Sequence, residues 1–241
     1  MDINYLLEKA VEMKSSDLHL CTGAPPMVRV HGELEAIEDY LLSAEDCDRL
    51  ARQCLSSEQY NRMMEIGEVD GAHSINGVGR FRLNIFKQRN SVAIAARAIP
   101  FEVPSAEQLG LPKAAYELAA KQRGLVLITG PTGSGKSTTL ASMIDYINNV
   151  RKCHIITVED PIEYLHRHRK SIIVQREIGD DTRSFANATR AALREDPDVM
   201  LIGEMRDQET ISAALTAAET GHLVLSTLHT AGAAKTIDRI I

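Results

Sequence analysis

The chain has 241 residues, with 27 basic and 33 acidic side chains and a formal charge of −6 at neutral pH. Its content of 44% hydrophobic and 25% charged residues is typical of a globular protein with one large or two ordinary domains. The acidic balance disfavours nucleic acid as a ligand, and the sequence has neither a membrane-spanning apolar run nor a secretory signal pattern, so we expect a cytoplasmic protein.

The first part of the chain predicts a mixture of helices and short strands. Residues 18–37 predict strands that are broken by glycine and proline. Residues 43–46, Ser-Ala-Glu-Asp, are typical of a capping box at the start of a helix. An earlier, opening helix is predicted from apolar residues at helical spacing, which are Ile3, Leu6, Leu7, Ala10 and Val11.

A two-residue alternation of polar and apolar side chains follows over residues 80–85. This alternation predicts a half-buried strand, and residues 92–99 predict a second strand that pairs with it. Together these patterns predict an α+β domain over residues 1–99. Several prolines then mark a linker over residues 100–112.

Residues 113–241 alternate between apolar strands and amphipathic helices, which predicts a mostly parallel sheet with helices on its faces. The sequence stops inside a helical pattern that begins near Ala231, so we expect this domain to be truncated at its C-terminus. The expected strands are 125–129, 154–158, 172–175, 199–203 and 222–227. The expected helices are 137–149, 184–195 and 208–220.

Residues 130–137 read Gly-Pro-Thr-Gly-Ser-Gly-Lys-Ser, which is a complete phosphate-binding loop. Its glycines let successive backbone N–H groups face phosphate oxygens. Lys136 supplies a cation for the β- and γ-phosphates, and the Ser137 hydroxyl can bind Mg²⁺. We therefore predict a nucleoside triphosphate site. Its binding residues are Gly130, Pro131, Thr132, Gly133, Ser134, Gly135, Lys136, Ser137 and Thr138.

Two of the expected strands end in acidic residues. Glu159, Asp160 and Glu163 follow one strand, and Glu204 follows another. An acid at such a strand end commonly holds Mg²⁺ through water, and one carboxylate must orient and deprotonate the water that attacks the nucleotide. The sequence alone does not rank the first three acids for these two roles.

Histidines and arginines supply further candidates for contact with the phosphates. His222 and His229 flank one expected strand, which suggests polar sensors of the γ-phosphate. Phosphoryl transfer also needs cations that stabilise charge on the transferring group. The candidates are Arg80, Arg82 and Arg97 on the paired strands of the first domain and Arg123 just before the phosphate loop's strand.

Taken together, these segments resemble the type II/IV secretion ATPase superfamily and, within it, the type IV pilus retraction ATPases. The resemblance implies a PAS-like α+β domain followed by a RecA-like P-loop ATPase domain, with ATP and Mg²⁺ bound at their junction. The motifs that carry it are Ser16–Leu20, Pro26–Gly32, Gly130–Ser137, Thr157–Glu163, Asp196–Asp207 and Gly221–Thr230.

The same resemblance implies roles for individual residues. Glu163 is expected as the general base and Glu204 in the shell of Mg²⁺, with Glu159 and Asp160 beside the metal. The histidines are expected near the γ-phosphate. Arg123 is expected among the nucleotide-binding residues, and the three arginines of the first domain are expected to act as arginine fingers.

The implied activity is mechanical, because hydrolysis would drive disassembly of a pilus at its inner-membrane base. The implied partners are five further copies of the chain in a hexamer, an inner-membrane pilus platform protein that holds it at the membrane, and a paralogous retraction ATPase. One alternative is a pilus-extension or type II secretion ATPase, which carries an extra domain ahead of the PAS-like one. Another is an accessory subunit that binds nucleotide without hydrolysis, which Lys136, Glu163 and Glu204 disfavour.

Overall fold

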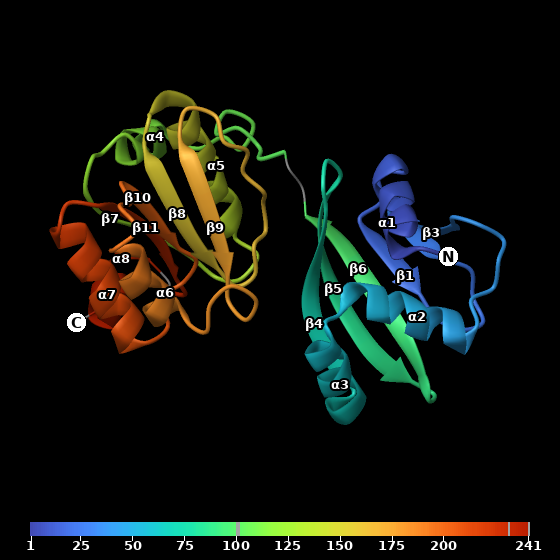
Figure 1. Cartoon of the computed structure of the whole chain (residues 1–241). Coiled ribbons are helices and arrows are strands. Elements are labelled where there is room, and N and C mark those ends of the chain that lie inside the picture. The colour runs from blue at the N-terminus through green and yellow to red at the C-terminus, as the bar shows by residue number, and fades with distance from the viewer. Residues whose placement is uncertain (100–101, 231, 241) are drawn as a thin grey trace. The chain divides into compact units, whose positions relative to one another are not determined.

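The computed structural model describes residues 1–99, 102–230 and 232–240. The chain divides into two compact units, Met1–Pro100 and Phe101–Ile241, which are described separately (Figure 1). The first two residues of the expected linker, and Ala231 at the expected start of the last helix, lie outside the described residues.

The first unit combines an antiparallel sheet with helices. Its strands lie in the order β3-β2-β1-β6-β5-β4. Its helices are α1 (Ile3–Glu12), α2 (Ala44–Cys54) and α3 (Ser57–Ile66). Its strands are β1 (Asp17–Leu20), β2 (Met27–Val30), β3 (Glu33–Ala36), β4 (Glu68–Ile75), β5 (Gly79–Gln88) and β6 (Ser91–Ile99).

The predicted alternation along β5 is confirmed. Phe81, Leu83 and Ile85 are buried in one hydrophobic core, which the helices share. The intervening residues lie on the other face of the sheet, because successive side chains of a strand point to opposite sides. The predicted pairing with the following strand is also confirmed, since Arg82 of β5 lies opposite Arg97 of β6.

Local signals set the helix ends of this unit. Ser43 begins α2 with the predicted capping box: its hydroxyl accepts the N–H of Asp46 (3.1 Å), and the Asp46 carboxylate accepts the N–H of Ser43 (3.0 Å). The placement of Val11 on the buried side of α1 is wrong, because its side chain is 38% exposed. The buried side of α1 consists of the other four predicted residues, Ile3, Leu6, Leu7 and Ala10, which stand at helical spacing.

The second unit is built on a parallel sheet in the order β7-β11-β10-β8-β9. The expected strands and helices are confirmed with small shifts of their ends. The strands are β7 (Gly124–Thr129), β8 (His154–Glu159), β9 (Ile172–Glu177), β10 (Val199–Ile202) and β11 (Leu223–Leu228). The helices are α4 (Lys113–Ala119), α5 (Lys136–Val150), α6 (Phe185–Ala192), α7 (Gln208–Glu219) and α8 (Ala233–Ile240).

Helices cover both faces of this sheet and form a separate core on each (Figure 1). Neighbouring residues of β10 serve opposite cores, because Leu201 packs with α4 and α5, whereas Met200 and Ile202 pack with α6 and α7. Since the paired strands are parallel, their carboxyl ends meet at one edge of the sheet.

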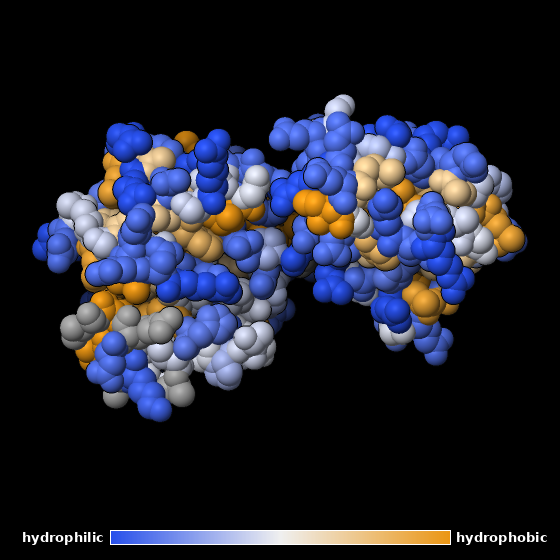
Figure 2. Space-filling view, turned by 90° about the horizontal axis from the view of Figure 1, so that it is seen from below, coloured by the Kyte–Doolittle hydropathy of each residue, from blue (hydrophilic) through white to orange (hydrophobic). Residues whose placement is uncertain are grey.

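Figure 2 shows one face of the molecule coloured by hydropathy. Hydrophilic residues cover most of the face drawn in Figure 2, and hydrophobic ones appear only in small groups. Within the described residues, no helix has the length and apolar character needed to cross a lipid bilayer.

Candidate functional site

A cavity of about 510 Å³ opens at the carboxyl ends of the strands in the second unit. The loop after β7, the segment after β8, and the ends of β10 and β11 all contribute to it. It contains nine residues expected from the sequence, which are Thr132, Gly133, Gly135, Lys136, Ser137, Thr138, Glu159, Asp160 and Glu163, together with the expected Glu204 and His229.

The phosphate loop has the backbone geometry that its glycines permit. Gly133 and Gly135 take positive φ angles of 77° and 84°, which only glycine adopts without strain. At Gly130 a Cβ atom would lie 2.6 Å from the Ser134 hydroxyl, and that hydroxyl donates to the Pro131 carbonyl (2.7 Å). The loop therefore turns tightly into α5.

The start of α5 presents donors to the cavity. Its N-cap residue is Gly135, so no side chain caps the first turn. Unpaired N–H groups at a helix start attract anions, and the helix dipole adds to that attraction. The Lys136 ammonium lies over the same loop, where it donates to the carbonyls of Gly130 (3.0 Å) and Pro131 (2.9 Å).

The acids after β8 differ strongly in environment. Asp160 and Glu163 are exposed in the cavity, whereas Glu159 faces inward. The Glu159 carboxylate accepts hydrogen bonds from the hydroxyl of Thr157 (2.7 Å) and from the side-chain amide of Gln175 (3.2 Å). Burial is the main influence on it and raises the pKa of Glu159 above the usual range of a glutamate.

The acid after β10 lies between two basic side chains. Arg206 contacts the Glu204 carboxylate through its Nε (2.6 Å), and the Nε2 atom of His229 lies 3.7 Å away. The side chain of Glu204 is 14% exposed. Neighbouring strands fix this corner, because the hydroxyl of Thr227 donates to the carbonyl of Gly203 (2.6 Å).

Two expected site residues lie elsewhere in the unit. His222 precedes β11 and His229 follows it, so about seven strand steps, roughly 23 Å, separate them. The imidazole Nδ1 of His222 contacts the carbonyl of Ala217 (2.8 Å) at the end of α7. Arg123 likewise precedes β7, at the end opposite the phosphate loop. Neither residue lines the cavity, and their contact with the nucleotide stays a prediction.

The three arginines of the first unit lie on β5 and β6. Arg82 and Arg97 are exposed and lie opposite each other on the paired strands, and Arg97 donates to the Asp17 carboxylate (2.8 Å). Arg80 is half-buried on the same face. They belong to a different unit from the cavity, and their part in its chemistry stays a prediction.

Several cavity residues were not expected from any sequence pattern. Tyr164 follows Glu163, and its hydroxyl lies 3.3 Å from that of Thr138. His166 is half-buried, and desolvation lowers its pKa to about 4. Arg206 could have been expected in the cavity from the sequence, because it stands two residues after the strand-end acid Glu204.

The donor set suits a magnesium ion that arrives with a nucleotide. Magnesium prefers one or two protein oxygens, with phosphates and water completing its shell. The cavity offers the Ser137 hydroxyl and the Glu204 carboxylate for this purpose. Among the described residues, no cluster of three or more His, Cys, Asp or Glu side chains forms a protein-only metal site.

Comparison with known proteins identifies the group to which this site is related. A family model for the type II/IV secretion system protein matches residues 83–241. The chain is 49% identical over 241 residues to the type IV pilus retraction ATPase PilT of Pseudomonas aeruginosa, covering all of this chain and 70% of that protein. It is also 49% identical to a twitching motility protein of Neisseria gonorrhoeae, covering 99% of this chain and 64% of the relative.

A solved structure resembles the chain as well. The crystal structure of the pilus retraction motor PilT with bound ADP matches with a TM-score of 0.89 and 53% identity, covering all of this chain and 70% of that one. The expected fold class, a PAS-like α+β domain followed by a RecA-like P-loop ATPase domain, is confirmed.

Proposed function

This chain belongs to the type II/IV secretion system protein family, and we propose that it is an ATP-hydrolysing motor that powers type IV pilus retraction. The observation that carries the proposal is the cavity itself, in which a phosphate loop, strand-end acids and His229 converge. The identity with named retraction ATPases supports retraction as the task that hydrolysis drives.

The residues of the cavity divide the chemistry among them. The N–H groups of the loop and the Lys136 ammonium bind the phosphates, and the Ser137 hydroxyl and Glu204 would hold the shell of a magnesium ion that arrives with them. Magnesium, when bound, neutralises charge on the phosphates. Glu163 orients the attacking water and takes its proton, and its exposure in the cavity favours it over the inward-facing Glu159.

The hydrolytic step also needs cations near the transferring phosphoryl group. Lys136 and Arg206 line the cavity, and Arg80, Arg82 and Arg97 complete the set as arginine fingers of a neighbouring subunit. The exposure of the last two leaves their guanidinium groups accessible to another copy of the chain. An arginine supplied in this way stabilises the transition state and commonly raises kcat by about 10³- to 10⁵-fold.

Arginine fingers supplied in trans require at least two copies of the chain. From its resemblance to the retraction ATPases, we propose that the chain works as a homohexamer beside a paralogous retraction ATPase, and that an inner-membrane pilus platform protein holds it at the membrane from the cytoplasmic side. The existence of a PilU ATPase related to this chain supports the paralogous partner.

ATP turnover by the full-length protein tests the proposed activity. Lys136→Ala removes the loop's ammonium, and we expect kcat to fall by at least about 100-fold, because a preorganised charge at the phosphates is lost. A phosphate-release assay measures this change. Undiminished turnover in the variant would contradict the motor proposal. Wild-type twitching of cells that carry the Lys136→Ala variant would also contradict it.

Mixed assemblies test the arginine fingers. An Arg82→Ala subunit keeps its own phosphate loop, and a Lys136→Ala subunit keeps its own arginine. If the finger acts in trans, mixing the two inactive variants restores part of the turnover. Co-assembly is checked by pull-down with a tag on one variant, and a co-assembled mixture without turnover contradicts action in trans.

A further inference from the structure

The segment between β8 and β9 carries Glu163, and side chains of β9 hold it on both sides of that residue. The N–H of Ile162 donates to the Glu177 carboxylate (3.0 Å). Two residues later, the carbonyl of Tyr164 accepts a hydrogen bond from the side-chain amide of Gln175 (2.9 Å). The backbone is therefore fixed immediately before and immediately after Glu163.

The register of the sheet explains why β9 can do this. Gln175 and Glu177 are two residues apart, so their side chains lie on the same face of the strand. They pair in register with Thr157 and Glu159 of β8, the strand from which the segment departs. Glu177 is only 8% exposed, and a hydrogen bond in such surroundings is stronger than one in water.

Gln175 stands at the centre of this network. Its Nε2 group donates to Glu159 (3.2 Å) as well as to the Tyr164 carbonyl, and its Oε1 atom accepts the N–H of His166 (2.8 Å). An amide side chain donates and accepts at once, which neither a carboxylate nor an aliphatic side chain can do. Glu159 receives a further bond from the Thr157 hydroxyl, so its inner oxygen is engaged by protein donors.

We propose that Gln175 is a positioning residue for ATP hydrolysis, whose amide holds the 160–166 segment so that Glu163 meets the attacking water. The inference rests on the proposed function, in which Glu163 is the base. It also gives Glu159 a place in the positioning network instead of the metal-binding role expected from the sequence. A displacement of about 1 Å in a catalytic group can cost about 100-fold in rate, so small losses of this support are measurable.

The first test replaces Gln175 with Glu in the full-length protein. The new carboxylate matches the amide in size and still accepts the N–H of His166, but it cannot donate to Glu159 or to the Tyr164 carbonyl. We expect kcat to fall about 10- to 100-fold while KM for ATP stays within about threefold, because the phosphate loop is untouched. Val174→Thr is the matched control, since Val174 is a 37% exposed neighbour on the same strand.

A second variant reverses the pair. Glu159→Gln combined with Gln175→Glu lets residue 159 donate to residue 175, so the contact between the two side chains forms again. The double variant still has no donor for the Tyr164 carbonyl, so we expect its kcat to stay within about threefold of that of Gln175→Glu alone. Recovery of the wild-type kcat overturns the inference, because the contact with Glu159, and not the hold on the 160–166 segment, then decides the rate.

A third variant guards against loss of the fold. Gln175→Met keeps the length of the side chain without charge or strong hydrogen bonds, and thermal unfolding reports whether it is folded. A folded Gln175→Met protein with reduced kcat and unchanged KM supports the inference, and one with wild-type kcat overturns it. If the wild type and Val174→Thr fail to hydrolyse ATP, the proposed function falls as well. If both hydrolyse ATP and Gln175→Glu keeps pace with them, only the positioning role falls.

Discussion

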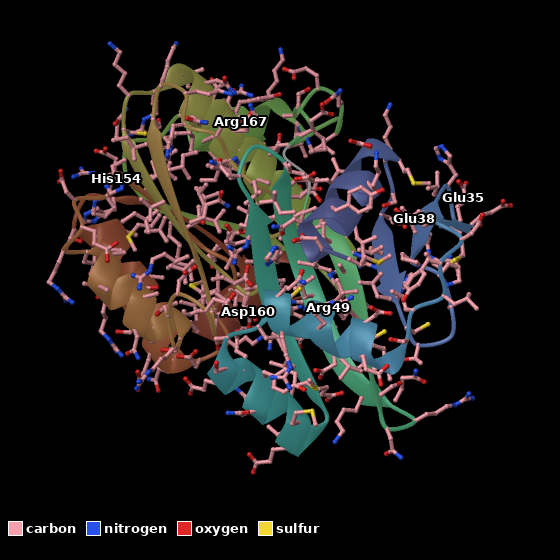
Figure 3. The ribbon with its side chains drawn as sticks, turned by 45° about the vertical axis from the view of Figure 1, so that its right-hand side comes forward. Glu35, Glu38, Arg49, His154, Asp160 and Arg167 are labelled. Carbon is pink, nitrogen blue, oxygen red and sulfur yellow. The ribbon has the colours of Figure 1, made fainter. Side chains whose placement is uncertain are left out.

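The two ends of the parallel sheet in the second unit carry similar residue types in different settings. Figure 3 labels both ends of β8, with His154 at the start of the strand and Asp160 just after its end. At the starting end, the Asp198 carboxylate accepts the N–H of His154 (2.8 Å). At the other end, Asp160 is exposed and lines the nucleotide cavity.

The same contrast recurs on β11, where one histidine stands at each end. His222 contacts the end of α7, whereas His229 lies in the cavity beside Glu204. Polar residues at the starting ends connect elements of the fold to one another, and those at the carboxyl ends face the cavity. Strand direction therefore separates residues that hold the fold from residues that meet the ligand. Three predictions test this separation.

The largest effect is expected at Glu163. Glu163→Gln keeps the size of the side chain but removes the proton acceptor, so we expect kcat to fall about 10²- to 10⁴-fold with ATP still bound. Steady-state turnover and binding of a fluorescent ATP analogue measure the two quantities. Normal turnover would move the base to Glu159 or Asp160.

The two histidines of β11 form a matched pair of intermediate effect. His229→Ala should lower kcat about tenfold or more, because a polar group beside the phosphates is lost. His222→Ala should leave kcat within about twofold and lower the free energy of unfolding by about 1 kcal/mol, through the lost contact with α7. Turnover and urea unfolding of both variants check this. Equal losses of kcat in the two variants would contradict the distinction between the two ends of the sheet.

The smallest effect concerns pH. Burial lowers the pKa of His166 to about 4 from its ordinary value of 6.5. Between pH 4 and pH 6.5 this imidazole therefore binds a proton in the unfolded chain but stays neutral in the folded chain. Stability from this group is present above pH 6.5 and is lost as the pH falls toward 4. His166→Asn should reduce the loss between pH 7 and pH 5 by about 1 kcal/mol in urea unfolding. An unchanged pH dependence would place the sensitive group elsewhere.

Much of the second unit could be predicted because its signals are local. The phosphate loop, strand β8 after it and the acids at the strand ends are each recognised from a run of neighbouring residues in the sequence. The order of the strands is not local, and β11 lies between β7 and β10 although it comes last among them. Gln175 went unnoticed for the same reason, since its partner Glu159 is sixteen residues away.

In the first unit, the elements without a clear pattern were missed. No repeating pattern predicts β4 (Glu68–Ile75), in which Val69 is the buried hydrophobic residue of a largely polar strand. It pairs along its whole length with β5, whose own alternation was clear. A weakly patterned edge strand thus takes its structure from its neighbour, which a reading of one segment at a time does not capture.

The bonds of Lys136 with its own loop have a consequence for binding thermodynamics. Because the ammonium donates to the carbonyls of Gly130 and Pro131, an arriving phosphate exchanges hydrogen bonds with the loop and does not simply add new ones. The gain is only the difference between a neutral and a charged acceptor, about 1–2 kcal/mol.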